Sequence, residues 1–291
     1  MPNGIIVIDK DQNWTSMDVC AKLRGIFHEK RVGHAGTLDP MATGVLPVFV
    51  GRATRAVEFA GEGDKEYVAG LRLGLVTNTQ DTSGETLEER PVSVTAEELE
   101  TVLERFRGEI QQVPPMYSAI KINGKKLYEL ARKGREVERP ARKVTIHALT
   151  LESREGERDF TIRVRCSKGT YVRTLCHDIG QTLGCGGCMS SLRRTMAAGF
   201  TMEDAVKLET VQQAREAEKL LLPVDAYFAG RPMVILKAEL EKKVRNGMTV
   251  ILPQDPGVAG ECRVYGESGE FLALGKLTGR KLETVKSFFS V

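Results

Sequence analysis

The sequence has little of several features that mark common classes of protein. It has one tryptophan and four histidines, and its formal net charge of +3 is too small to indicate a partner by itself. No apolar run approaches the roughly 18–20 residues that a membrane-spanning helix needs. The first ten residues, MPNGIIVIDK, lack the basic and apolar regions of a secretory signal. These absences favour a cytoplasmic globular protein that does not bind membranes.

Several catalytic signatures are also missing. No glycine-rich stretch leads into Gly-Lys-Ser or Gly-Lys-Thr, which excludes a P-loop. No G-x-S-x-G sequence occurs, which excludes the nucleophile elbow of the α/β-hydrolases. Among six cysteines, Cys185 and Cys188 form a lone C-x-x-C pair, whereas zinc usually takes four ligands. We expect reduced thiols and no metal. A zinc site completed by Cys176 and His177 stays open as the minor alternative.

What is present is an ordinary globular composition. The 291 residues are 41% hydrophobic and 28% charged, which allows one large domain with a sizeable core and one small domain. Arg231 and Pro232 mark a change in the predicted secondary structure, because short strands dominate after them. We therefore expect a domain over residues 1–229 and a second, β-rich domain over 230–291.

Hydrophobic periodicity predicts alternating strands and helices in the first domain. Thr15 with Asp18, and Thr95 with Glu98, form capping boxes that should begin two helices. A third amphipathic helix should cover 172–183 and end at Gly184. Strands are predicted at 5–8, 45–50, 67–75, 144–151 and 160–166, a mixture typical of an α+β fold.

Positive charge is concentrated in one segment. Residues 121–143 contain nine Lys or Arg and three Glu, a local excess of six positive charges. A basic face on a nearly neutral protein favours a polyanionic partner. A solvated charged surface is the alternative that composition alone leaves open.

The stretch GHAGTLDPMATGVLPV, residues 33–48, carries a single carboxylate among glycines and prolines. Pro40 biases Asp39 away from helical backbone, and Gly36 allows the chain to approach a ligand closely. A rigid loop at a strand edge is a common place for a catalytic group. The residues alone also allow an acid that only organises its own turn.

This stretch closely resembles the catalytic-aspartate motif of the TruB family of tRNA pseudouridine synthases. Further matching motifs occur in the family's order, namely GIIVIDK…TS (4–16), DKEYVAGLRLG…T…T…D…GE (64–85), PPMYSAIKINGKKLYELARKG (114–134), CSKGTYVRTLCHDIG (166–180) and LRRT (192–195). The tail from about Arg231 is similar to a PUA module. Asp11 and Asn13 stand where the family usually has Pro and Gly, which should leave this loop less constrained.

The resemblance implies a pseudouridine synthase fold, in which helices flank a large mixed, mostly antiparallel central sheet, with a small β-rich PUA-like C-terminal domain. It also implies that Asp39 is the nucleophile and that Arg173 forms an ion pair with it, which would favour the charged carboxylate. Tyr67 would stack on the target base and Leu192 would cap the pocket. His34 would take the place in the RNA that the extruded uridine leaves.

The implied reaction cleaves the bond from uracil N1 to ribose C1′ and rejoins the base through C5, so no cofactor or metal is expected. The implied substrate is the uridine at position 55 in the T-arm of tRNA, and a monomer should suffice. An insertion at about 110–143 should grip RNA. The residues expected to contact RNA are basic: Lys10, for which a structural role is the alternative, and Lys121, Lys125, Lys126, Arg132 and Lys133. A non-catalytic or guide-dependent RNA-binding protein of the same fold is the alternative.

Overall fold

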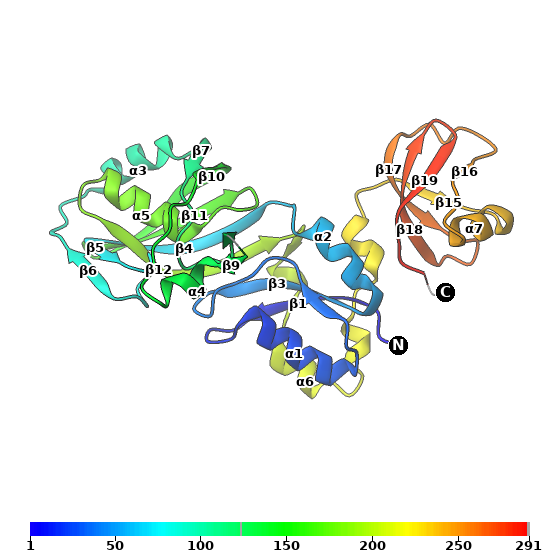
Figure 1. Ribbon diagram of the computed structural model, residues 1–291, viewed down its shortest axis with the longest axis horizontal. Helices are drawn as coiled ribbons and strands as arrows, with labels where there is room; N and C mark the ends of the chain where they lie inside the picture. Colours follow the sequence, from blue (N-terminus) through cyan, green and yellow to red (C-terminus); the bar gives the residue numbers. More distant parts are fainter. Residues whose placement is uncertain (123, 290–291) are drawn as a thin grey trace.

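The computed structural model describes residues 1–122 and 124–289. It is elongated, and a large sheet with its helices is joined at one end to a smaller β module (Figure 1). The large sheet has ten strands in the order β14-β1-β3-β12-β4-β11-β10-β7, with β2 added to β3 and β13 added to β12. These strands are β1 (Gly4–Lys10), β2 (Val32–His34), β3 (Thr43–Val50), β4 (Lys65–Leu73), β7 (Gly108–Gln112), β10 (Arg142–Glu155), β11 (Asp159–Cys166), β12 (Gly187–Ala197), β13 (Phe200–Thr201) and β14 (Ala205–Lys207).

The sheet is mixed and mostly antiparallel, as the sequence predicts. Among the described strand pairs of this large sheet, only β1–β14 and β3–β12 are parallel. Strand alternation gives β1 two buried faces: Ile6 and Ile8 belong to one core cluster, and Ile5 and Val7 to another. β1 therefore reads as a continuous apolar run, because both faces are covered.

Helices cover the sheet at the positions that the capping boxes predict. Both capping boxes form, with Thr15 before α1 and Thr95 before α3. In Figure 1, α1 and α6 lie beside β1 and β3, and α3 and α5 lie at the opposite end of the sheet. The helices are α1 (Ser16–Phe27), α2 (Val57–Ala60), α3 (Ala96–Arg105), α4 (Leu127–Ala131), α5 (Val172–Thr182), α6 (Leu208–Gln213) and α7 (Ala238–Arg245), with short 3₁₀ turns η1 (Gly51–Ala56), η2 (Met202–Asp204), η3 (Ala217–Leu220) and η4 (Val224–Phe228). No helix among the described residues is long and apolar enough to cross a membrane.

The last part of the chain forms a separate five-stranded sheet in the order β15-β17-β18-β19-β16. Its strands are β15 (Met233–Ile235), β16 (Val250–Ile251), β17 (Gly260–Tyr265), β18 (Phe271–Thr278) and β19 (Lys281–Ser287). This sheet has its own apolar cluster, to which α7 contributes Val244. The module also packs on the large domain through aromatic rings. The ring centre of Phe228 in η4 lies 6.0 Å from that of Phe271 and 5.7 Å from that of Phe288.

Two short hairpins extend from the large sheet. β5 (Leu75–Thr77) pairs with β6 (Thr86–Glu89), and β8 (Lys121–Ile122) pairs with β9 (Lys125–Lys126). The second hairpin belongs to the basic segment. Among the described residues of that segment, α4 is the one helix. Gly74, at φ +79°, ends β4 before β5 begins, so the strand predicted at 67–75 divides there.

Candidate active site

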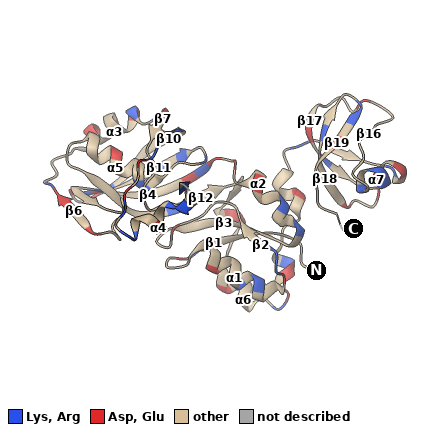
Figure 2. Cartoon of the chain, in the orientation of Figure 1, with Lys and Arg blue, Asp and Glu red and all other residues tan. Residues whose placement is uncertain are grey.

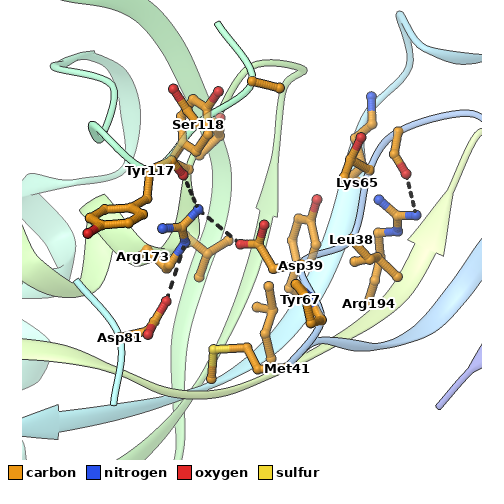
Figure 3. Close-up of a pocket in the computed structure, with 18 of the residues that line it drawn as sticks. Leu38, Asp39, Met41, Lys65, Tyr67, Asp81, Tyr117, Ser118, Arg173 and Arg194 are labelled. Carbon is orange, nitrogen blue, oxygen red and sulfur yellow. Dashed lines mark hydrogen bonds and ion pairs between the residues drawn. The ribbon is translucent and has the colours of Figure 1, made fainter. Parts of the chain in front are cut away.

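Asp39 lies at a cavity of about 830 Å³, which is lined by the loop before β3, by β4 and β12, and by the first residues of α5. The size is within the range of small-molecule and cofactor pockets. Side chains from distant parts of the sequence line it, including Asp39, Tyr67, Arg173, Leu192 and Arg194. Figure 3 shows Asp39 between Arg173 on one side and Tyr67 on the other. The side chain of Asp39 is 41% exposed, so a substrate can reach its carboxylate.

The loop that carries Asp39 is anchored at several points. The hydroxyl of Ser16 accepts from the Leu38 N–H at 2.9 Å and donates to the Leu38 carbonyl at 3.2 Å. The Asn13 N–H donates to the Pro40 carbonyl at 2.8 Å. Asn13 has φ 67°, so it adopts the left-handed backbone that asparagine tolerates. The side chain of Asp11 is held by Lys207 at 2.6 Å, so this loop is tied down without the family's Pro and Gly.

Arg173 connects Asp39 to its surroundings. Its Nη2 lies 3.0 Å from Asp39 Oδ2, and its Nε lies 3.8 Å from Asp81 Oδ2. Two backbone carbonyls accept its remaining N–H groups, that of Thr79 at 3.1 Å and that of Tyr117 at 2.8 Å. The guanidinium is only 7% exposed, so its position is fixed from several directions. The structure therefore brings Asp39 and Arg173 together, as the resemblance implies.

Tyr67 and Leu192 form neighbouring parts of the cavity wall. Tyr67 is on β4 and is 9% exposed, and burial raises the pKa of its hydroxyl. Leu192 is on β12 and is partly buried against the main apolar cluster. Since β4 and β12 are paired, the two residues come from adjacent strands. Both line the cavity that contains Asp39, and their contacts with a base are a proposal.

His34 is the one expected active-site residue that does not line the cavity. It ends β2 opposite Val48 of β3, and its Nδ1 is buried without a hydrogen-bond partner. Burial lowers the pKa of His34, and the charge of Arg194 acts in the same direction. A neutral imidazole ring can stack on bases. We therefore keep the insertion of His34 into RNA as a proposal.

Lys10 requires a correction, because the structure gives it a place inside the protein. It is 0% exposed, so it cannot contact RNA as expected. Its Nζ donates to the carbonyls of Asp11 (3.0 Å), Trp14 (2.7 Å) and Pro40 (3.4 Å). Burial lowers its pKa to about 8. Lys10 therefore links the loop after β1 to Pro40 and helps to fix the loop that carries Asp39.

Replacement of Lys10 by Met tests this structural role. The variant removes the donor from the partly buried Asp11 and Trp14 carbonyls, whereas the Pro40 carbonyl keeps the Asn13 N–H, so we expect a loss of about 1–3 kcal/mol in unfolding free energy. Denaturant unfolding measures that loss. The salt dependence of tRNA binding should stay as in the wild type, and a flatter dependence would return Lys10 to the RNA interface.

The other basic residues lie on or next to the β8–β9 hairpin, where Figure 2 shows the chain coloured blue for Lys and Arg close to α4. Lys121, Lys125 and Lys133 are exposed. Lys126 and Arg132 each lie 5.4 Å from the ring centre of Tyr128, and both Arg132 and Tyr128 line the cavity. The basic segment thus extends from the surface to the edge of the cavity.

The zinc alternative gains no support. All six cysteines are free and buried. Burial raises the pKa of the Cys188 thiol to about 11 and also raises that of Cys176, which disfavours the thiolate that zinc needs. Across residues 1–122 and 124–289, no three His, Cys, Asp or Glu side chains gather as metal ligands would.

Sequence reasoning missed three groups at the cavity. Asp81 lies inside a quoted motif, but nothing in its spacing shows that it faces Arg173. Lys65 lines the cavity while its Nζ donates to the Gly61 and Gly63 carbonyls. Arg194 follows Leu192 by two residues, and strand alternation could have placed both on the cavity face.

Comparison with known proteins gives the family. The model of the TruB family pseudouridylate synthase N-terminal domain matches residues 24–172. The model of the tRNA pseudouridylate synthase B C-terminal domain matches residues 173–229. The chain belongs to the TruB family. It is therefore a pseudouridine synthase, an enzyme that isomerises uridine, and the boundary between the two matched regions falls next to Arg173.

Relatives support membership in the TruB family over most of the chain. A tRNA pseudouridine synthase B of Ralstonia pickettii is 46% identical over 91% of this chain and 85% of its own length. One from Clostridium kluyveri is 41% identical over 98% and 99%. Among solved structures, a Cbf5-Nop10-Gar1 complex contains a chain with TM-score 0.73 and 28% identity over 98% of this chain and 85% of that one. The pseudouridine synthase fold is thus confirmed.

Proposed function

We propose that this TruB-family protein converts the uridine at position 55 in the T-arm of tRNA to pseudouridine. The observation that carries the proposal is the buried Arg173 guanidinium held 3.0 Å from an accessible Asp39 carboxylate inside the cavity. The relatives named tRNA pseudouridine synthase B, at 41–47% identity, support tRNA as the substrate.

The proposed reaction needs groups that the cavity provides. Asp39 is the nucleophile that assists cleavage of the bond between N1 and C1′, and Arg173 orients it. The base then turns and rejoins ribose through C5; C5 loses a proton and N1 gains one, so no atom is added. Tyr67 and Leu192 hold the base from two sides during the turn. No step requires a cofactor.

The target uridine must leave its stack to reach Asp39, which costs a few kcal/mol. Contacts between the basic segment and RNA phosphates would offset part of that cost and fix the register of the RNA arm. Because Arg132 and Tyr128 line the cavity, this segment would grip RNA close to the extruded nucleotide. We propose residues 110–143 as the RNA-gripping insertion.

We further propose that residues 230–291 form a PUA-like RNA-binding domain. Their separate sheet and apolar cluster support a domain boundary after the large sheet. The aromatic contacts of Phe228 support a fixed position for the module on the catalytic domain. The same proposal has the protein acting as a monomer in the cytoplasm.

Neutralisation of Lys125, Lys126 and Lys133 to Gln tests the RNA grip. Each lost phosphate contact should lower the slope of log affinity against log salt by about 0.7–0.9, so we expect weaker binding and a slope reduced by about 2. A salt titration of tRNA binding measures both. The matched control replaces Lys22, Lys30 and Lys219, which are exposed on the α1 side of the molecule. Equal slopes in the two triple variants would remove the segment from the interface.

The function itself is tested by mapping modified uridines in a bare tRNA transcript after incubation with the protein. We expect modification at position 55 alone. Modification only after a guide RNA is added would support the guide-dependent alternative, which is worth testing because solved structures of H/ACA complexes share this fold. Binding without any modified uridine would show a non-catalytic protein.

A further inference from the structure

Arg194 is a buried cation for which the proposed reaction has no role so far. It is 1% exposed and is among the largest fully buried side chains of the protein. Its Nε donates to the Val45 carbonyl at 2.8 Å, and its Nη2 donates to the Gly36 carbonyl at 3.0 Å. In the part of the chain that the structure describes, no carboxylate forms an ion pair with it. A buried charge that has only neutral partners is costly, so its presence calls for an explanation.

The register of the sheet places Arg194 directly beside Tyr67. The two residues are cross-strand partners on β12 and β4, so their side chains share one face of the sheet. Both line the cavity that contains Asp39. The two side chains are close enough for the Arg194 guanidinium to act on the Tyr67 phenol. The same guanidinium holds Gly36, three residues before Asp39 in the sequence.

Close packing keeps this contact in one geometry. On its other side, Arg194 pairs with Gly44 of β3. A Cβ atom at Gly44 would lie 2.2 Å from the Arg194 carbonyl oxygen, so only glycine lets the two strands approach this closely. Arg194 therefore lies where three strands meet, with little room to move.

We propose that Arg194 is a positioning residue for Tyr67: its guanidinium donates to the phenol oxygen, fixes the ring beside Asp39, and leaves the phenol O–H to donate into the cavity. This inference rests on the proposed function, since Tyr67 must contact the base. A guanidinium has only donors, so the phenol oxygen must be the acceptor in this bond. The direction of the pKa effect agrees: burial raises the pKa of Tyr67, and Arg194 opposes that rise.

The test compares Arg194→Lys with Arg193→Lys. The lysine at 194 keeps the charge but cannot span the Val45 and Gly36 carbonyls and Tyr67 at once. Misplacement of the ring should lower kcat by about 10–100-fold, while KM changes less than about threefold because RNA binding is intact. Arg193 is the matched control, because it is 42% exposed and contacts Asp9 and Thr43. Its variant should retain wild-type kcat.

A double-mutant cycle separates this role from a purely structural one. In a Tyr67→Phe background, which keeps the ring and removes the hydroxyl, Arg194→Lys should cost less than about threefold in kcat. An undiminished cost there, or a kcat equal to that of Arg193→Lys in the wild-type background, would overturn the proposal. The wild type and Asp39→Asn are assayed alongside: a wild type without turnover would contradict the proposed function, whereas with an active wild type and an inactive Asp39→Asn a failure concerns Arg194 alone.

A second measurement applies if Arg194→Lys does not fold. Nuclear magnetic resonance of isotope-labelled arginine side chains follows the wild type and Tyr67→Phe. The Arg194 N–H signals should shift and exchange faster with solvent when the hydroxyl is removed, whereas those of Arg193 should not change. Unchanged Arg194 signals would show that the guanidinium does not bind the phenol, and the proposal would be wrong.

Discussion

Replacement of Asp39 by Asn should abolish turnover while leaving tRNA binding intact. The amide is nearly isosteric but cannot act as a nucleophile, so we expect kcat to fall by at least about 10³-fold. Only 41% of the side chain is exposed, and among the described residues its ion pair is with Arg173, so few RNA contacts depend on its charge. Release of tritium from C5-labelled uridine in tRNA measures the rate.

Two controls make the Asp39 result interpretable. Affinity for tRNA, measured by filter binding, should stay within about threefold of the wild type if the carboxylate acts in the chemical step. Asp11→Asn alters a nearby exposed carboxylate that pairs with Lys207 and does not line the cavity, so its turnover should be normal. Turnover near wild type in Asp39→Asn would refute the nucleophile assignment.

Replacement of Arg173 by Ala should reduce both activity and stability. The variant frees the Asp39 carboxylate to rotate, so we expect kcat to fall by about 10²-fold or more. It also leaves the buried Asp81 without its cation, which should cost about 3 kcal/mol of unfolding free energy. This loss of unfolding free energy lies at the lower end of the range for broken buried ion pairs, because Thr79 and Ser83 still donate to Asp81 Oδ1. Denaturant unfolding and the tritium assay measure the two effects.

The control for Arg173 is an exposed ion pair on the same sheet. Arg72 lies 2.8 Å from Asp159, and their side chains are 44% and 35% exposed. Because solvent screens that pair, Arg72→Ala should cost no more than about 1 kcal/mol and should not change turnover. If Arg173→Ala were as stable as Arg72→Ala, the buried network around Asp81 would not be a stabilising element.

Much of the fold could be predicted locally. Capping boxes at Thr15 and Thr95 predicted where α1 and α3 begin, because the caps involve only residues three positions apart. Apolar runs predicted β1 and β3. The conformation of the basic segment was not predicted: among its described residues a hairpin comes first, and the helix covers Leu127–Ala131.

Sequence by itself determined the family, the candidate chemistry at Asp39, Tyr67 and Arg173, and most of the secondary structure, because motifs and periodicity are properties of short stretches. Tertiary structure alone decided which cations are buried. Lys10 is inside and Lys125 is outside, although both are lysines in strands. Arg194 faces the cavity and Arg193 faces solvent. Burial depends on strand register and on which distant segments pack together, and no local pattern contains that information.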